Sequence, residues 1–166
     1  MKHKKALLAV LGCVAALAVP AAVMAADDDA IVIGNTSVID TVDPVHNGSN
    51  AWSLTADGVS ETIFMQDKEG NLVSRIVDSI EQKDELTWEM KLKEGVKFSD
   101  GSDVDAQALC DSMNTIMENN EMASTSAGVI TFTPVDDMTV ELKSERETTV
   151  MPSVLCEYSM VVLKDT

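Results

Sequence analysis

Apolar and polar residues alternate between Leu86 and Lys93. The apolar members of this run are Leu86, Trp88, Met90 and Leu92. Because a strand points successive side chains to opposite faces, the run predicts a strand with one buried face. The alternation resumes at 96–98, where a second, shorter strand is expected.

The period of the apolar residues changes after the turn signal Asp100-Gly101. Six residues then fall on one stripe of a helix, namely Ala106, Leu109, Cys110, Met113, Ile116 and Met117. Asp103 or Asp105 would cap the first turn of this helix. The pattern therefore predicts a strand, a short strand, a turn and a capped helix in that order.

Weaker patterns predict further elements on either side. Upstream, the apolar run 31–34 is typical of a strand buried on both faces, and a helix is expected after the loop 47–50. The stripe of that helix would be Trp52, Ala56, Val59 and Ile63. Downstream, 118–128 predicts a loop, 129–132 a strand, 135–143 an alternating segment, and 149–155 a short helix with Pro152 in its first turn.

The first 25 residues have the features of an export signal. Lys2, Lys4 and Lys5 precede the apolar run from Ala6 to Val19, and a small-residue cleavage site ends at Ala25. We expect cleavage there, which leaves residues 26–166 in the periplasm or at the cell surface. Lipidation at Cys13 is the alternative.

The chain is strongly acidic, with 12 Lys and Arg against 28 Asp and Glu and a net charge of −16. Removal of residues 1–25 takes away three lysines and no acid, so the charge becomes −19. Nucleic acid is excluded as a partner, because phosphate binding needs clustered Lys and Arg. The charge favours solubility, and attraction of cationic solutes is a second interpretation.

No catalytic or metal-binding constellation is present in the sequence after residue 25. His46 is the one histidine there, and the acidic run 100–105 lacks the order of a calcium loop and fits a turn before a helix cap. Cys110 and Cys156 would be free or paired: export permits a disulfide, whereas the apolar stripe suits a free Cys110. We therefore expect no enzyme, no metal and no cofactor.

The stretch LTWEMKLKEGVKFSDGSDVDAQAL resembles a segment of the family 5 extracellular solute-binding proteins, the peptide- and nickel-binding components of ABC importers. The matching residues are Leu86, Thr87, Met90, Leu92, Gly95, Val96, Lys97, Phe98, Asp100, Gly101, Ala106 and Leu109. Departures from the family pattern are Lys93, Ser99 and Asp105. The segment 42–46 resembles the turn after the family's first strand, 69–81 resembles its hairpin with Ser74 in place of proline, and 159–163 resembles a later strand.

The resemblance implies an α+β fold. This fold would be the N-terminal part of a periplasmic-binding-protein type II fold, mainly the small antiparallel-sheet subdomain of lobe one with flanking helices. Because family members run to several hundred residues, residues 26–166 would form an incomplete first lobe.

The resemblance also implies a function. The chain would be the substrate-binding component of an ABC importer, a monomer that captures oligopeptides or a related solute outside the membrane and delivers it to a permease. Asn47, Asn50 and Trp52 are the candidate ligand contacts, although Asn50 also suits a helix cap and Trp52 a core aromatic. An exported α+β interaction or structural domain without transport activity is the alternative.

Overall fold

The computed structural model describes residues 32–34, 41–46 and 48–164, without the side chains of residues 48–50. It divides into two units, residues 1–34 and 35–166, and every helix and strand described below belongs to the second. The expected signal peptide at 1–25 lies outside the described residues. The strand expected at 31–34 is wrong for its described part, because residues 32–34 are exposed and pair with no described strand. A strand buried on both faces requires such neighbours.

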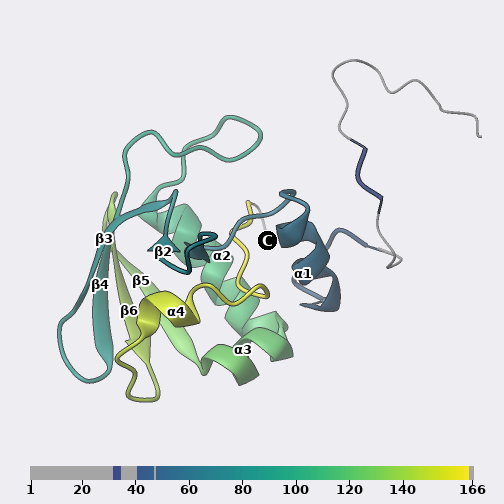
Figure 1. The fold of residues 1–166 in the computed structure, drawn as a ribbon. Helices are drawn as coiled ribbons and strands as arrows, with labels where there is room; N and C mark the ends of the chain where they lie inside the picture. Colours follow the sequence, from purple (N-terminus) through teal and green to yellow (C-terminus); the bar gives the residue numbers. More distant parts are fainter. Residues whose placement is uncertain (1–31, 35–40, 47, 165–166) are drawn as a thin grey trace, which may run out of the picture. The chain divides into compact units, whose positions relative to one another are not determined.

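A four-stranded antiparallel sheet forms one side of the second unit (Figure 1). Its strands are β3 (Val77–Gln82), β4 (Thr87–Leu92), β5 (Ile130–Asp136) and β6 (Thr139–Ser144), in the order β3-β4-β6-β5. A small hairpin of β1 (Met65–Gln66) and β2 (Leu72–Val73) precedes them. The expected α+β class with antiparallel sheets is confirmed.

The alternation that predicted the β4 strand is confirmed. Trp88, Met90 and Leu92 are buried, and the register places Trp88 opposite Leu142 and Met90 opposite Val140 on β6. The short strand expected at 96–98 is reduced to one bridge between Lys97 and Asp103. The alternating segment 135–143 is divided by a hairpin turn between β5 and β6.

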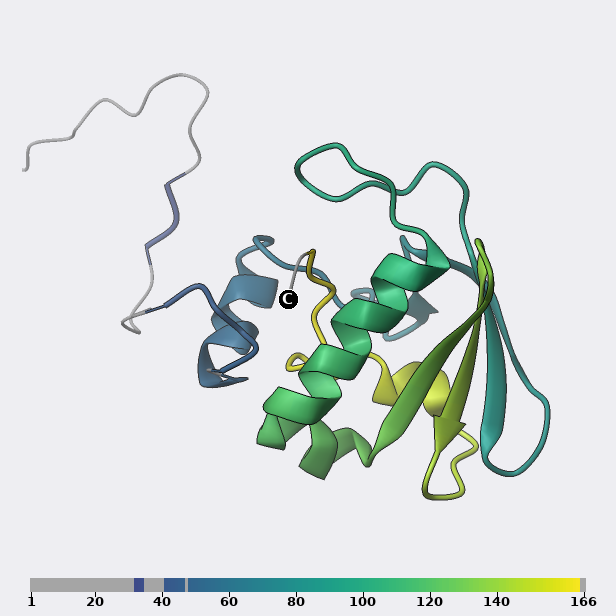
Figure 2. The ribbon, with the colours of Figure 1, turned by 180° about the vertical axis from the view of Figure 1, so that it is seen from behind.

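Helix α2 (Ala106–Asn119) lies across one face of the sheet (Figure 2). Asp105 is its N-cap, because the Asp105 side chain accepts a hydrogen bond from the backbone N–H of Ala108 at 2.8 Å. All six apolar residues of the predicted stripe are buried against the sheet. Asn114 also exchanges two hydrogen bonds with the backbone of Phe132, at 2.8 and 3.0 Å, and so ties α2 to the edge strand β5.

The remaining helices differ from the expected pattern. Residues 118–128 form the end of α2 and a separate helix α3 (Glu121–Ala127), so the loop predicted there is wrong. Helix α1 (Gly48–Ala56) ends before Val59, because Gly58 with a φ of 73° turns the chain away. The short helix near Pro152 is confirmed as α4 (Met151–Val154). The strand at 159–163 is reduced to a bridge between Thr62 and Val161.

One buried side-chain polar atom has no hydrogen-bond partner among the residues that the structure describes. The indole Nε1 of Trp88 is buried and forms no hydrogen bond with any described residue. An unsatisfied buried donor costs about 1–3 kcal/mol. This cost offsets part of the stabilising free energy that burial of the large apolar ring contributes.

Replacement of Trp88 by phenylalanine should therefore be mild. Trp88→Phe removes the unpaired donor while losing some buried ring surface, and we expect the free energy of unfolding to change by less than about 1 kcal/mol. Trp88→Ala, the matched control, should cost about 3–5 kcal/mol. Urea unfolding measures both, and a Trp88→Phe loss as large as that of Trp88→Ala would contradict the account.

Candidate functional site

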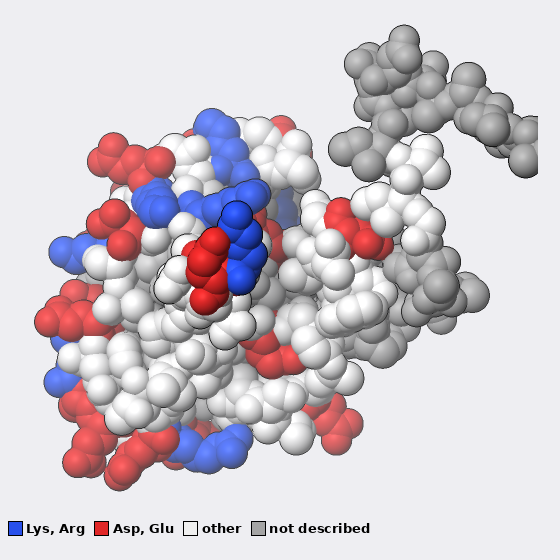
Figure 3. Space-filling view, in the orientation of Figure 1, with Lys and Arg blue, Asp and Glu red and all other residues white. Residues whose placement is uncertain are grey.

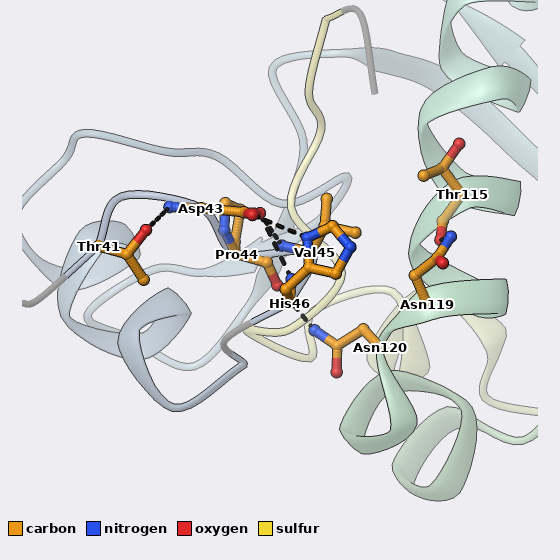
Figure 4. A network of polar contacts seen from close by, with 8 residues as sticks. All are labelled: Thr41, Asp43, Pro44, Val45, His46, Thr115, Asn119 and Asn120. Atoms are coloured by element: carbon orange, nitrogen blue, oxygen red, sulfur yellow. Dashed lines mark hydrogen bonds and ion pairs between the residues drawn. The ribbon is translucent and has the colours of Figure 1, made fainter.

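The segment from Thr41 to His46 forms a tight turn organised by the carboxylate of Asp43 (Figure 4). Asp43 Oδ1 accepts hydrogen bonds from the backbone N–H of Val45 at 2.9 Å and of His46 at 3.4 Å. The His46 Nδ1–H donates to Asp43 Oδ2 at 2.8 Å. Such side-chain-to-backbone bonds are what an Asp-Pro turn supplies.

The hydrogen bond from the His46 side chain, helped by the two backbone N–H groups, lowers the pKa of Asp43 below its ordinary value. The Asp43 carboxylate is therefore charged at neutral pH. Because the folded-state pKa is the lower one, the stabilisation of the turn is present above the ordinary carboxyl pKa. It is lost as the pH falls through the lowered value.

Asn120 joins this turn to the helices. Its side-chain Nδ2 donates a hydrogen bond to the carbonyl oxygen of Pro44 at 2.9 Å. Its Oδ1 accepts from the backbone N–H groups of Met122 and Ala123, at 3.0 and 3.2 Å, and so caps α3. The side chain is buried, with Asn120 4% exposed, so these bonds form where water does not compete.

Two open hollows border the contact between the Asp43–His46 turn and Asn120, which we call the Asn120 joint. His46 lines both hollows. The α3 hollow, of about 550 Å³, is lined by Val45, His46, Asn119, Asn120, Glu121, Met122, Thr125 and Ser126. The α2 hollow, of about 620 Å³, is lined by Asp43, Val45, His46, Thr115, Asn119, Leu163 and Lys164. Amide, hydroxyl and imidazole groups line both hollows together with apolar side chains such as Val45, which suits a small polar solute.

Two of the three candidate contacts from the sequence, Asn50 and Trp52, belong to α1, which contributes no residue to the lining of either hollow. Trp52 is 57% exposed, so its interpretation as a core aromatic is wrong: the phase of α1 buries Ala51 and Leu54 instead. Helix α1 contacts α3, which carries Met122 and Thr125 of the α3 hollow. Asn50 lies in α1 with an undescribed side chain, and Asn47 is outside the described residues.

The sequence patterns did not identify Asn120 or Met122. Asn120 stands in the polar run Glu118-Asn119-Asn120-Glu121, which the apolar pattern predicted as a loop. An asparagine between two helical segments is a common N-cap, and that signal could have divided the run. Its partner Pro44 lies 76 residues away, beyond the reach of a local pattern.

The described residues hold no group of three or more His, Cys, Asp or Glu side chains that could bind a metal ion. Cys110 and Cys156 are both free thiols. Burial raises the pKa of Cys110 to about 12, so its thiol stays neutral and packs as an apolar group. Within the described part of the chain, no helix has the length and apolar character needed to cross a membrane.

Comparison with known proteins identifies the family. The model for bacterial extracellular solute-binding proteins, family 5 Middle, matches residues 71–166, more than half of the chain. The chain belongs to this family. Its members bind solutes and are not enzymes.

Curated relatives include glutathione-binding proteins. The protein GsiB of Shigella dysenteriae serotype 1 is 33% identical over 108 residues, which cover 64% of this chain and 20% of the relative. GsiB of Escherichia coli K12 is 32% identical over the same length. The chain therefore spans 20% of the length of each of these two relatives.

Solved structures of solute-binding proteins share the fold. OppA of Burkholderia pseudomallei aligns with a TM-score of 0.62 and 18% identity, over 75% of this chain and 28% of that one. NikA of Brucella suis, in complex with Fe(III)-EDTA, aligns with a TM-score of 0.59 and 19% identity, over 67% of this chain and 23% of that one. NikA of Staphylococcus aureus, in complex with Ni(L-His)2, aligns with a TM-score of 0.58 and 20% identity, over 63% of this chain and 22% of that one.

Loss of the Asn120 side chain should weaken the site and the fold together. Asn120→Ala removes the α3 cap and the bond to Pro44, and we expect the free energy of unfolding to fall by about 2–3 kcal/mol. Asn120→Asp keeps a capping oxygen but places it against the Pro44 carbonyl, and should cost about 1–3 kcal/mol.

The neighbouring Asn119→Ala is the matched control. The Asn119 side chain is exposed and bonds within its own helix, to the Thr115 carbonyl, so we expect a loss below about 0.5 kcal/mol. Thermal and urea unfolding measure all three variants. Equal losses in the free energy of unfolding for Asn119→Ala and Asn120→Ala would show that the hydrogen bonds of Asn120 stabilise the fold no more than an exposed side chain does.

Proposed function

We propose that the chain is part of the substrate-binding component of an ABC importer, which captures an oligopeptide or a related small solute outside the membrane and delivers it to a permease. The proposal rests on the surface around Asn120, where the Asp43–His46 turn meets α2 and α3. There a hydrogen-bonded turn, the α2–α3 junction and two open hollows present amide, hydroxyl and imidazole groups together with apolar side chains. Family membership supports it.

Within this proposal, residues 26–166 form an incomplete first lobe, mainly its small antiparallel subdomain. The four-stranded antiparallel sheet with α2 across it agrees with that part of the fold. The other lobe would close on the solute from the opposite side, as in hinge-closing binding proteins.

Residues 1–25 are proposed as a cleaved export signal. The exported chain should then begin at Ala26, which its intact mass measures. A lipid-modified Cys13 at the N-terminus would contradict the proposal.

Trp52, Asn47 and Asn50 are proposed as direct solute contacts, and Trp52 is the one whose side chain the structure describes. Its exposed ring on α1 offers a flat apolar surface next to α3, and aromatic rings of this kind commonly border solute sites. The indole of Trp88, by contrast, is buried in the core. The two tryptophans of the chain therefore report on different environments.

This difference provides a binding assay. In Trp88→Phe, Trp52 is the single fluorescent indole, and we expect its emission to shift or be quenched when a bound solute covers it. The solutes to titrate are reduced glutathione, a set of tripeptides and Ni(L-His)2. Calorimetry on the unaltered chain measures the same binding independently.

Trp52→Phe is the matched control. Its remaining indole, Trp88, should respond little to solute, and its affinity should fall by about tenfold or less, as expected for loss of one contact worth about 1 kcal/mol. Absence of binding heat and of any emission change across the panel would overturn the solute-binding proposal for this chain. That result would favour an exported interaction or structural domain.

A further inference from the structure

No lysine or arginine lines the α3 hollow. Residues 41–46 and the helices α1, α2 and α3 include neither lysine nor arginine. The sequence has none between Lys5 and Lys68, and again none between Lys97 and Lys143. The basic residues of the described chain lie on the hairpin, the sheet, the connecting loops and the last residues, among them Lys164 at the α2 hollow.

Acidic groups border the same surface. Glu121 lines the α3 hollow, is exposed, and forms no ion pair with a described residue. Asp43 lines the α2 hollow, and its lowered pKa keeps it charged. The one basic side chain at either hollow is Lys164, whose ammonium forms an ion pair with Asp100.

The space-filling view agrees with this distribution. In Figure 3 the blue side chains lie over the upper, left, lower and central parts of the face, whereas the α1 side, to the right, shows red and white side chains. A surface with unbalanced negative charge raises the local concentration of cations and speeds their association. The α3 hollow also lacks the Arg or Lys group that usually pairs with a carboxylate or phosphate.

We propose that the solute taken at this surface is cationic, of the class of peptides or small amines that carry a net positive charge. The inference rests on the proposed solute-binding function and adds the charge of the ligand. Glu121 is the group that would meet the cation in the α3 hollow, with the hydroxyl of Thr125 and the thioether of Met122 beside it. An anionic tripeptide such as glutathione would meet repulsion there.

A charge series of peptides tests the proposal on the full chain. Gly-Lys-Gly, Gly-Gly-Gly and Gly-Glu-Gly carry a positive, a zero and a negative net charge, and reduced glutathione serves as a second anionic tripeptide. Calorimetry at low salt ranks their dissociation constants. We expect Gly-Lys-Gly to bind about fivefold to tenfold more tightly than Gly-Glu-Gly, a ratio in line with one exposed charge contact. The ratio should shrink in about 1 M NaCl, where the screening length falls to about 3 Å.

Two variants locate the effect. Glu121→Gln should reduce the preference for Gly-Lys-Gly by about twofold to fivefold. Glu85→Gln removes the same charge from the exposed turn between β3 and β4 and should leave the preference unchanged.

The outcomes separate this inference from the proposed function. Tighter binding of Gly-Glu-Gly or glutathione, or equal binding of all peptides, overturns the cationic inference and leaves solute binding standing. An equal loss of preference in both variants overturns the role of Glu121. No binding by any peptide overturns the inference together with the function on which it rests.

Discussion

The side-chain amide of Asn120 is the interaction on which the candidate site depends. It uses its donor and its acceptor at once: Nδ2 holds the Pro44 carbonyl, and Oδ1 caps α3. A buried amide that satisfies both neighbours is costly to replace, because any variant leaves a partner unpaired. The position of the Asp43–His46 turn relative to α2 and α3 follows from this one residue, and both hollows follow from that position.

The sheet and α2 hold the elements that meet at Asn120 in place. Alternation in β4 and the apolar stripe of α2 bury Met90 and Met113 from opposite sides of one core. Both elements were predictable, since each is specified by its own local pattern of side chains. The N-cap at Asp105 was predictable for the same reason: a cap and its helix are neighbours in sequence.

The parts that the sequence did not predict depend on distant contacts or on weak local signals. Helix α3 has the sequence EMASTSA, which offers no apolar stripe, and it forms next to a cap whose other partner is Pro44. The orientation of Trp52 follows from the packing of Ala51 and Leu54, which periodicity alone did not fix. Of the candidate site, the Asp-Pro turn and the region of α1 were predictable, whereas Asn120, Met122 and Thr125 became visible once the helices were placed.

From charge and geometry together we propose that solute docks at the turn and the α2–α3 junction. Amide NMR of the labelled chain during titration with Gly-Lys-Gly tests this claim most directly. The account predicts shifts concentrated at Val45, His46 and residues 119–126, with the outer face of the β3-β4-β6-β5 sheet unchanged. Shifts centred on that sheet face, or an unchanged spectrum at saturating peptide, would contradict it.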